Sequence, residues 1–161
     1  MNQTHVHLLI THLPIIGSAL GAFVLIHGIW RKSNSTLIAA YNILILSAIG
    51  ASIAYLTGEG AEETVEQIKG ISENLIEEHA ESALSSLIAL IVTGIVAIVG
   101  LFATLRSSSM TRLIAFLTLA VSLVGFGLIA RTGYLGGQIR HTEIGSTTSS
   151  PAQQRTDTND D

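Results

Sequence analysis

The sequence predicts an all-α fold, a bundle of four transmembrane helices that cross the membrane up-down-up-down. Hydrophobic residues make up 48% of the 161-residue chain and charged residues only 12%, and the mean hydropathy is +0.53. Four apolar runs each have roughly the 17 to 25 residues that a helix needs to cross a bilayer core. None of these runs alternates apolar and polar residues with a period of two. A helix rather than a closed barrel is therefore expected to satisfy the backbone amides in lipid.

The four spans are expected at about residues 8–30, 37–57, 83–105 and 113–130. The first span has no basic segment before it, so we expect it to remain as helix one rather than to be cleaved as a signal peptide. Pro14 should either begin a regular helix or kink one, which would free the carbonyl of Ile10. Gly17 and Gly21 have G-x-x-x-G spacing, which would let another helix or a flat cofactor approach closely.

An acidic segment, residues 58–82, connects the second and third spans and holds eight glutamates against one lysine. Such a run is usually a solvated helix face. The alternative is a carboxylate and histidine site for iron, zinc or manganese, because Glu62, Glu63, Glu66, Glu78 and His79 are ligand types that these metals accept. Both interpretations remain open at this point.

Helix three is expected to begin near Ser72, before the membrane. A stripe with four-residue spacing starts there and comprises Ile71, Leu75, His79 and Ala83. His79 should therefore point with the apolar residues. The neighbouring Glu77, Glu78 and Glu81 fall largely off the stripe and should face water.

The end of the fourth span is glycine-rich. Gly133, Gly136 and Gly137 are expected to loosen the helix and to let the chain turn back over the bundle toward His141. Arg131 and Arg140 flank this turn, where they would either anchor at the interface or pair with an anionic group such as a haem propionate.

Residues 1–141 are thus expected to form one four-helix transmembrane domain. Residues 142–161 are rich in Ser, Thr, Gln and Asp and show no apolar period. They are predicted to be a disordered outer tail.

Basic residues set the expected orientation. Arg31 and Lys32 follow the first span, and Arg106 and Arg112 lie between the third and fourth spans. By the positive-inside rule these two connections should be cytoplasmic. Both termini and the acidic segment would then lie on the outer, periplasmic side of a bacterial inner (cytoplasmic) membrane.

The chain has no cysteine. A disulfide, an iron–sulfur cluster, a thiolate zinc site and a C-x-x-C-H haem attachment are therefore excluded. Any metal or haem would have to be held by nitrogen and oxygen ligands.

The six histidines are the main functional signal. Five of them fall on the predicted outer side: His5, His7, His12, His79 and His141. His12 and His79 should lie at a similar depth on two different helices, which makes them the first candidate pair of ligands. Ionisable residues inside a membrane suggest function by default. A single histidine at a membrane boundary is more often interfacial, which is the favoured interpretation for His27 and an equally open one for His5.

Three motifs resemble those of a family of small four-helix bacterial membrane proteins of unassigned function. They are "HLLITHLPI" at residues 7–15, "EEHAES" around His79 and the closing "GYLGGQIRH" that ends at His141. The resemblance covers helices one, three and four, and it implies His7, His12, His79 and His141 as site residues of a candidate b-type haem protein. Relatives of this kind are sometimes fused to cytochrome c modules or encoded with them. This chain departs from the family in its long acidic segment and in the Gln-Ile before Arg140 and His141.

These observations together lead us to expect a b-type haem, one or two per chain, bound near the outer face. His12 and His79 would be the axial ligands, with Arg131 or Arg140 near the propionates. Ligation by two histidines fills both axial positions and suits electron transfer. The expected partners are the lipid bilayer, a quinol or membrane redox partner, and a soluble cytochrome on the outer side. The chain would act as a subunit of a larger complex or as a homo-oligomer.

Two other classes of function stay open. One is a redox-silent metal-binding or metal-transport protein that uses the same histidines with glutamates. The other is a structural membrane subunit without a cofactor. The sequence shows no phosphate-binding glycine loop and no nucleophile with its base, and no nucleic-acid partner is expected. An electron-transfer subunit is therefore favoured over a stand-alone enzyme.

Overall fold

The computed structural model describes residues 3–66 and 73–140. Apart from short connections, the chain is helical in these two ranges and contains no strand there, which confirms the predicted all-α class. The helices are α1 (Gln3–Ile10), α2 (His12–Arg31), α3 (Asn34–Glu66), α4 (Glu73–Leu105) and α5 (Thr111–Arg140).

Four helical stretches are long and apolar enough to cross a membrane, as predicted. They are His7–Arg31, Asn34–Gly58, Glu73–Leu105 and Thr111–Ile139. The first stretch includes both α1 and α2. The two are separated only at Thr11, whose backbone remains in the right-handed helical region. Pro14 accounts for the interruption, because it has no N–H to donate to the carbonyl of Ile10.

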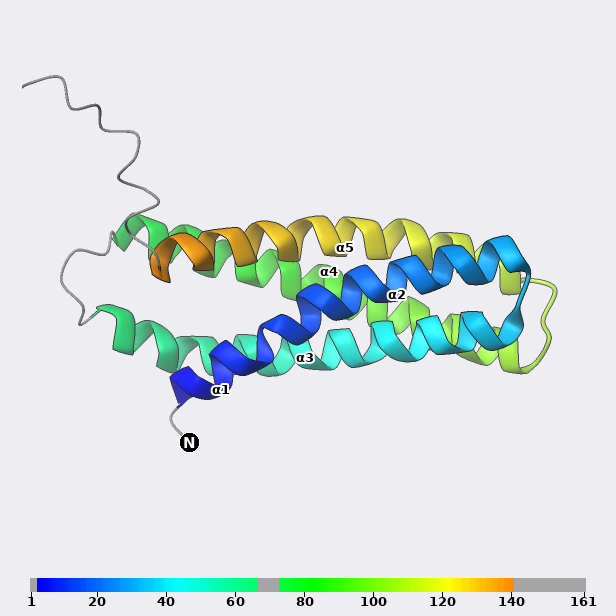
Figure 1. Ribbon diagram of the computed structural model, residues 1–161, viewed down its shortest axis with the longest axis horizontal. Coiled ribbons are helices and arrows are strands. Elements are labelled where there is room, and N and C mark those ends of the chain that lie inside the picture. The colour runs from blue at the N-terminus through cyan, green and yellow to red at the C-terminus, as the bar shows by residue number, and fades with distance from the viewer. Residues whose placement is uncertain (1–2, 67–72, 141–161) are drawn as a thin grey trace, which may run out of the picture.

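The helices form an elongated bundle in which α1 continues into α2, and α2, α3, α4 and α5 run in alternating directions (Figure 1). Each of α2, α3 and α4 packs against the next helix, and α2 also packs against α5, which closes the ring. The short α1 lies mainly against α3. The start of α1 and the end of α5 lie at the same end of the bundle, on the left in Figure 1.

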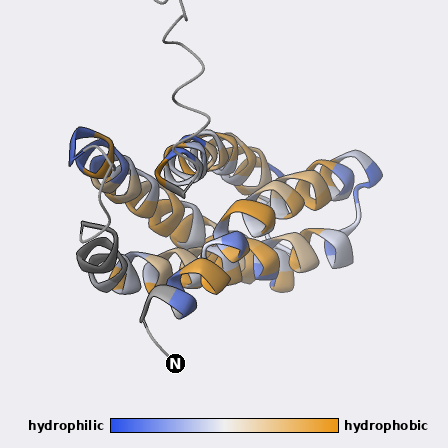
Figure 2. Ribbon diagram, turned by 60° about the vertical axis from the view of Figure 1, so that its left-hand side comes forward, coloured by the Kyte–Doolittle hydropathy of each residue, from blue (hydrophilic) through white to orange (hydrophobic). Residues whose placement is uncertain are grey.

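Large apolar side chains cover the outside of the bundle. Phe23 is 69% exposed, Leu56 76% and Trp30 76%, whereas many interior positions hold alanine, glycine, serine or threonine. Figure 2 shows hydrophobic residues along the lengths of the helices and hydrophilic ones toward their ends. An apolar surface of this extent would be costly in water. It fits a lipid bilayer, as the sequence predicted.

The G-x-x-x-G pair brings two helices together. A Cβ added at Gly17 would lie 3.1 Å from the Cβ of Ser47, and one at Gly21 would lie 2.6 Å from Leu44 Cδ2. The close approach expected at these glycines is therefore made by α3. The Ser47 hydroxyl also donates to the Pro14 carbonyl across the same contact, at 3.0 Å.

The helices continue beyond the predicted spans. α3 runs on to Glu66 and α4 begins at Glu73, so both enter the acidic segment 58–82. A helix of 33 residues is about 50 Å long, which exceeds the roughly 30 Å of a bilayer core. Hydropathy identifies only the apolar part of each helix. The helices themselves continue beyond that part by several polar turns.

The prediction of a turn at the glycines of the fourth span is wrong, because α5 remains helical through Gly133, Gly136 and Gly137 to Arg140. Two of these glycines serve packing instead. A Cβ at Gly133 would lie 2.9 Å from Ile15 Cδ1, and one at Gly136 would lie 3.1 Å from His79 Cε1. His141 and the predicted tail 142–161 lie outside the described residues.

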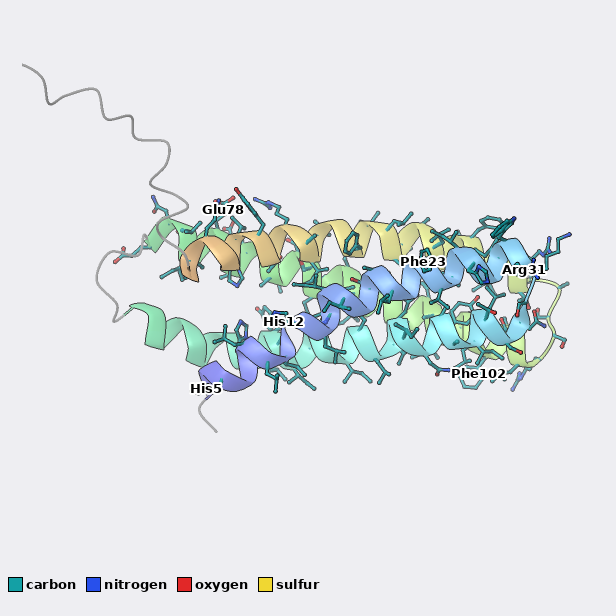
Figure 3. All side chains as sticks on the ribbon, viewed as in Figure 1. His5, His12, Phe23, Arg31, Glu78 and Phe102 are labelled. Carbon is teal, nitrogen blue, oxygen red and sulfur yellow. The ribbon has the colours of Figure 1, made fainter. Side chains whose placement is uncertain are left out.

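Charge separates the two ends of the bundle. Arg31, Arg106 and Arg112 lie at or beside the two short connections, whereas Glu73, Glu78 and other glutamates of the first turns of α4 lie at the opposite end. Figure 3 shows Arg31 and Glu78 near these opposite ends.

Candidate functional site

His79 lies near the start of α4 and points partly into the bundle, as the apolar stripe predicted. It is half-buried, while the neighbouring Glu77, Glu78 and Glu81 are exposed. Its Nδ1 lies 3.1 Å from the backbone carbonyl oxygen of Thr132 on α5. A carbonyl oxygen can only accept, so Nδ1 carries the proton and donates. In the neutral ring Nε2 then keeps a free lone pair.

The His79 ring packs closely against the backbone of Gly136. A Cβ at this position would meet His79 Cε1 at 3.1 Å and Nδ1 at 3.5 Å. Thr132 and Gly136 are four residues apart on α5, so they present the carbonyl and the bare backbone on one helix face. The imidazole is held between these two features.

A cluster of three buried hydroxyls lies one turn deeper along the same interface. Ser82, Ser86 and Thr132 are 3%, 0% and 6% exposed. The Oγ atoms of both serines lie 2.8 Å from Thr132 Oγ1. The residue whose carbonyl anchors His79 is thus itself tied to α4 through its side chain.

His7 has a similar anchor on the other side of the bundle. Its Nδ1 lies 2.9 Å from the carbonyl oxygen of Ala54 on α3 and 3.4 Å from Thr57 Oγ1. The same reasoning assigns the proton to Nδ1 and leaves Nε2 free in the neutral ring. Gly58 lies beside this ring, since a Cβ there would be 3.5 Å from His7 Cε1.

His7 and His79 lie at the same end of the bundle. They come from different helix pairs, because His7 is held by α1 and α3 and His79 by α4 and α5. Histidines that bind metal almost always donate their other ring N–H to a carbonyl or carboxylate. Both rings meet this condition, and the two anchored rings are therefore the candidate site.

Of the first candidate pair, the structure places His79 in this site and His12 outside it. His12 is exposed, and its Nδ1 lies 3.0 Å from the carbonyl oxygen of Leu8 in its own chain segment. It borders a shallow apolar groove between α2 and α3, which is also lined by Leu13, Ile16, Gly17, Leu20, Ile43 and Leu46. His7 and His12 are five residues apart, which corresponds to a rotation of about 140° around a helix. They therefore face different directions, so that His12 is exposed whereas His7 is half-buried against α3.

The remaining predicted residues lie around this site or away from it. Arg131 donates from Nη2 to Glu78 Oε1 at 2.8 Å, and both side chains are about half exposed. An exposed pair of this kind contributes little to stability. Arg140 ends α5. His5 is exposed, as is His27, which makes an edge-on contact with Trp30 at 6.1 Å between ring centroids.

Within residues 3–66 and 73–140, no group of three or more His, Cys, Asp or Glu side chains could hold a metal ion. The interpretation of the acidic segment as a carboxylate-rich metal site therefore gains no support from its described part. No protein-family model, curated protein or solved structure matches the chain.

Sequence reasoning did not identify Ser82, Ser86 and Thr132. A signal for the serines was present, because they follow His79 by three and seven residues and so share its helix face. Thr132 had no comparable signal, since its role depends on the rotation of α5 against α4.

Proposed function

We propose that this chain is a multi-pass membrane protein that binds a b-type haem at the end of the bundle where His7 and His79 lie, with these two histidines as the axial ligands. The observation that carries the proposal is the matched anchoring of the two rings. Each Nδ1–H is held by a backbone carbonyl of a neighbouring helix, at 2.9 Å and 3.1 Å, which leaves both Nε2 atoms available. The proposal keeps the cofactor expected from the sequence and replaces His12 by His7.

The donor set suits a haem better than a bare metal ion. The porphyrin supplies four nitrogens, so the protein needs to add only two axial ligands. A structural zinc site uses four protein ligands and a catalytic one uses three. No third donor of these types joins His7 and His79 within the described ranges.

The carbonyls of Ala54 and Thr132 fix the orientation of the two rings. They select the tautomer with the proton on Nδ1, and they raise the basicity of Nε2. The bound haem would supply one-electron transfer between its ferric and ferrous states. Glu78 directly precedes His79 in the sequence, and its ion pair with Arg131 provides a guanidinium near this end of the bundle.

The distribution of charge along the bundle supports one orientation in the membrane and a basic soluble protein as partner. We place the basic end, with Arg31 and Arg106, in the cytoplasm and the acidic end in the periplasm of a bacterial inner membrane. The acidic end suits a basic soluble cytochrome, because complementary charge speeds association. Electrons would come from a quinol or another membrane partner, and the chain would work as a subunit of a larger redox complex or as a homo-oligomer.

The test is the reduced-minus-oxidised visible spectrum of the full chain, purified in detergent after expression with ample haem. The wild-type protein should show the Soret and alpha bands of a six-coordinate b-type haem. His7→Ala and His79→Ala should each lose this spectrum. His12→Ala and His27→Ala are the matched controls and should keep it, because both side chains are exposed.

External imidazole separates loss of a ligand from loss of the fold. Added imidazole should restore the six-coordinate spectrum in His79→Ala, because it can replace the missing ring. A wild-type protein that binds no haem would refute the proposal, and metal analysis of that sample would show whether the site takes a metal ion instead. Loss of the spectrum in His12→Ala but not in His7→Ala would refute the assignment of the ligands.

A further inference from the structure

We infer that Thr132, together with Ser82 and Ser86, is a positioning unit that holds His79 in the one tautomer able to bind a ligand through Nε2. This inference rests on the proposed function only in taking His79 as a ligand. It concerns how the interior of the chain controls that ring. The three hydroxyls do not touch the ligand and act through the Thr132 carbonyl.

The hydrogen-bonding capacity of Thr132 is used completely in this cluster. A threonine hydroxyl has one proton to donate and two lone pairs that accept. Thr132 Oγ1 donates to the carbonyl of Leu128 at 3.2 Å. Both serine hydroxyls, at 2.8 Å, must then donate to Thr132 Oγ1. The direction of every hydrogen bond in the cluster is thereby fixed.

The positions of these residues make the cluster a clamp between two helices. His79, Ser82 and Ser86 follow one face of α4, and Leu128, Thr132 and Gly136 follow the facing side of α5. The two serine bonds set the rotation of α5 at Thr132. They therefore also set where the Thr132 carbonyl meets Nδ1 of His79 and where Gly136 meets the ring.

Thr111, the first residue of α5, donates to the Ala103 carbonyl of α4 at 3.2 Å, at the opposite end of α5 from His79. Two other buried hydroxyls, within the body of α5, lack a link between helices. Thr118 is fully buried, and its Oγ1 donates to the carbonyl of Ile114 in its own helix at 2.8 Å. Ser122 likewise donates to Leu119 at 2.9 Å. The two serine bonds to Thr132 lie beside the carbonyl that anchors His79, which favours a role in positioning over a general role in packing.

Without these hydrogen bonds between α4 and α5, the His79 imidazole would no longer be held in a single tautomer. Thr132→Val keeps the shape of the side chain but leaves both serine hydroxyls without their acceptor at 3% and 0% exposure. An unpaired buried donor is costly, so the serines should turn to carbonyls of their own helix. The α4–α5 contact would loosen, and the ring could also adopt the tautomer with the proton on Nε2, which cannot bind a metal through Nε2.

Nitrogen NMR of the imidazoles in the full chain, purified without haem, tests the inference directly. Wild-type His79 should show one tautomer, with the proton on Nδ1, and Thr132→Val should show a mixture. Thr132→Ser keeps the hydroxyl and should restore the wild-type signal. Thr118→Val is the matched control on the same helix and should leave His79 unchanged. A single, unchanged tautomer in Thr132→Val would overturn the inference.

A second variant guards against a general loss of fold. Ser82→Ala combined with Ser86→Ala removes both clamp bonds and leaves Thr132 paired with Leu128. It should give the same mixture of tautomers while the far-ultraviolet helical signal stays at the wild-type value. An unchanged His79 signal in this variant would also contradict a positioning role.

Haem titration separates this inference from the proposed function. Thr132→Val should bind haem about tenfold more weakly than wild type, at the lower end of the range found when a partner behind a ligand is lost. Thr132→Ser and Thr118→Val should bind it as wild type does. If wild type binds no haem, the proposed function fails and the NMR result alone decides the inference. If haem binds with equal affinity in wild type and Thr132→Val, the inference fails and the proposed function stands.

Discussion

Tyr41 is the largest side chain that is fully buried among the described residues, and it fits because of a single glycine. A Cβ at Gly100 would lie 2.6 Å from both Cε1 and Cζ of the Tyr41 ring. These distances are far below ordinary contact, and a rigid ring has no flexible end that could move aside. Gly100 is therefore the position at which α4 admits a large side chain of α3.

Gly100→Ala should lower the free energy of unfolding by roughly 1–3 kcal/mol, the usual cost of overpacking a core. Gly127→Ala is the control, because an added Cβ there meets nothing within 4 Å. That substitution should be neutral or stabilising by up to about 1 kcal/mol, since alanine favours the helix. Unfolding of both variants in mixed detergent micelles, followed by circular dichroism, gives the comparison. Equal stabilities would show that Tyr41 can repack.

The histidines show how much of the candidate site can be predicted from the sequence alone. The sequence placed His7, His12 and His79 at one end of the molecule and predicted that His79 points inward, which the structure confirms. It could not tell which of His7 and His12 is held against a neighbouring helix. That choice depends on how the first helix is rotated against the others, and a five-residue spacing turns the two rings about 140° apart.

At the scale of elements, the contact between α2 and α3 combines close packing with one hydrogen bond. Gly17 and Gly21 remove side chains from the α2 surface, and Leu44 and Ser47 of α3 lie against them. Ser47 is fully buried and donates to the Pro14 carbonyl at 3.0 Å. Hydroxyls are common links of this kind between membrane helices.

Ser47→Ala should lower the free energy of unfolding by about 0.6–1.7 kcal/mol, the range measured for interhelical hydrogen bonds in membrane proteins. Ser52→Ala provides the control on the same helix. Its hydroxyl bonds to Ala48 of its own helix at 3.0 Å, so little change is expected. The same unfolding assay measures both variants. A loss in Ser52→Ala as large as that in Ser47→Ala would argue against a special interhelical contact.

Hydropathy predicted the elements well along their apolar parts and less well at their ends. Each predicted span falls within a helical stretch long and apolar enough to cross a membrane, whereas α3 and α4 continue into the acidic segment and α5 continues through three glycines. Glycine in a helix costs only about 1 kcal/mol. Ile15 packs close to Gly133 and His79 packs close to Gly136, and such contacts cannot be seen in one sequence.

At the scale of the whole molecule, the bundle has a basic end and an acidic end. Arg31 and Arg106 lie at the short connections, while Glu73 and Glu78 lie at the end that carries His7 and His79. The proposed orientation puts the histidine site toward the periplasm. The absence of cysteine from the sequence makes this orientation simple to test.

Single cysteines at two exposed positions report the sides of the membrane. Asn74→Cys, at the start of α4, should react with a membrane-impermeant maleimide in intact spheroplasts. Ser109→Cys, in the connection before α5, should react only after the membrane is made permeable. Both positions are exposed, so a difference in labelling reports the membrane rather than burial. The reverse pattern would place the histidine site in the cytoplasm.

The sequence by itself determined that the chain is helical and suited to a bilayer. Long apolar runs have few other ways to satisfy their backbone in hydrocarbon, so composition is sufficient for that conclusion. The sequence also determined which imidazoles lie near one end. Only the tertiary structure decided that His7 rather than His12 is held against a neighbouring helix, that the Thr132 carbonyl and Gly136 contact the His79 ring, and that Ser82 and Ser86 bond to Thr132. Those contacts depend on the rotation of each helix about its own axis. Packing between helices sets that rotation, and the hydropathy of a single helix does not.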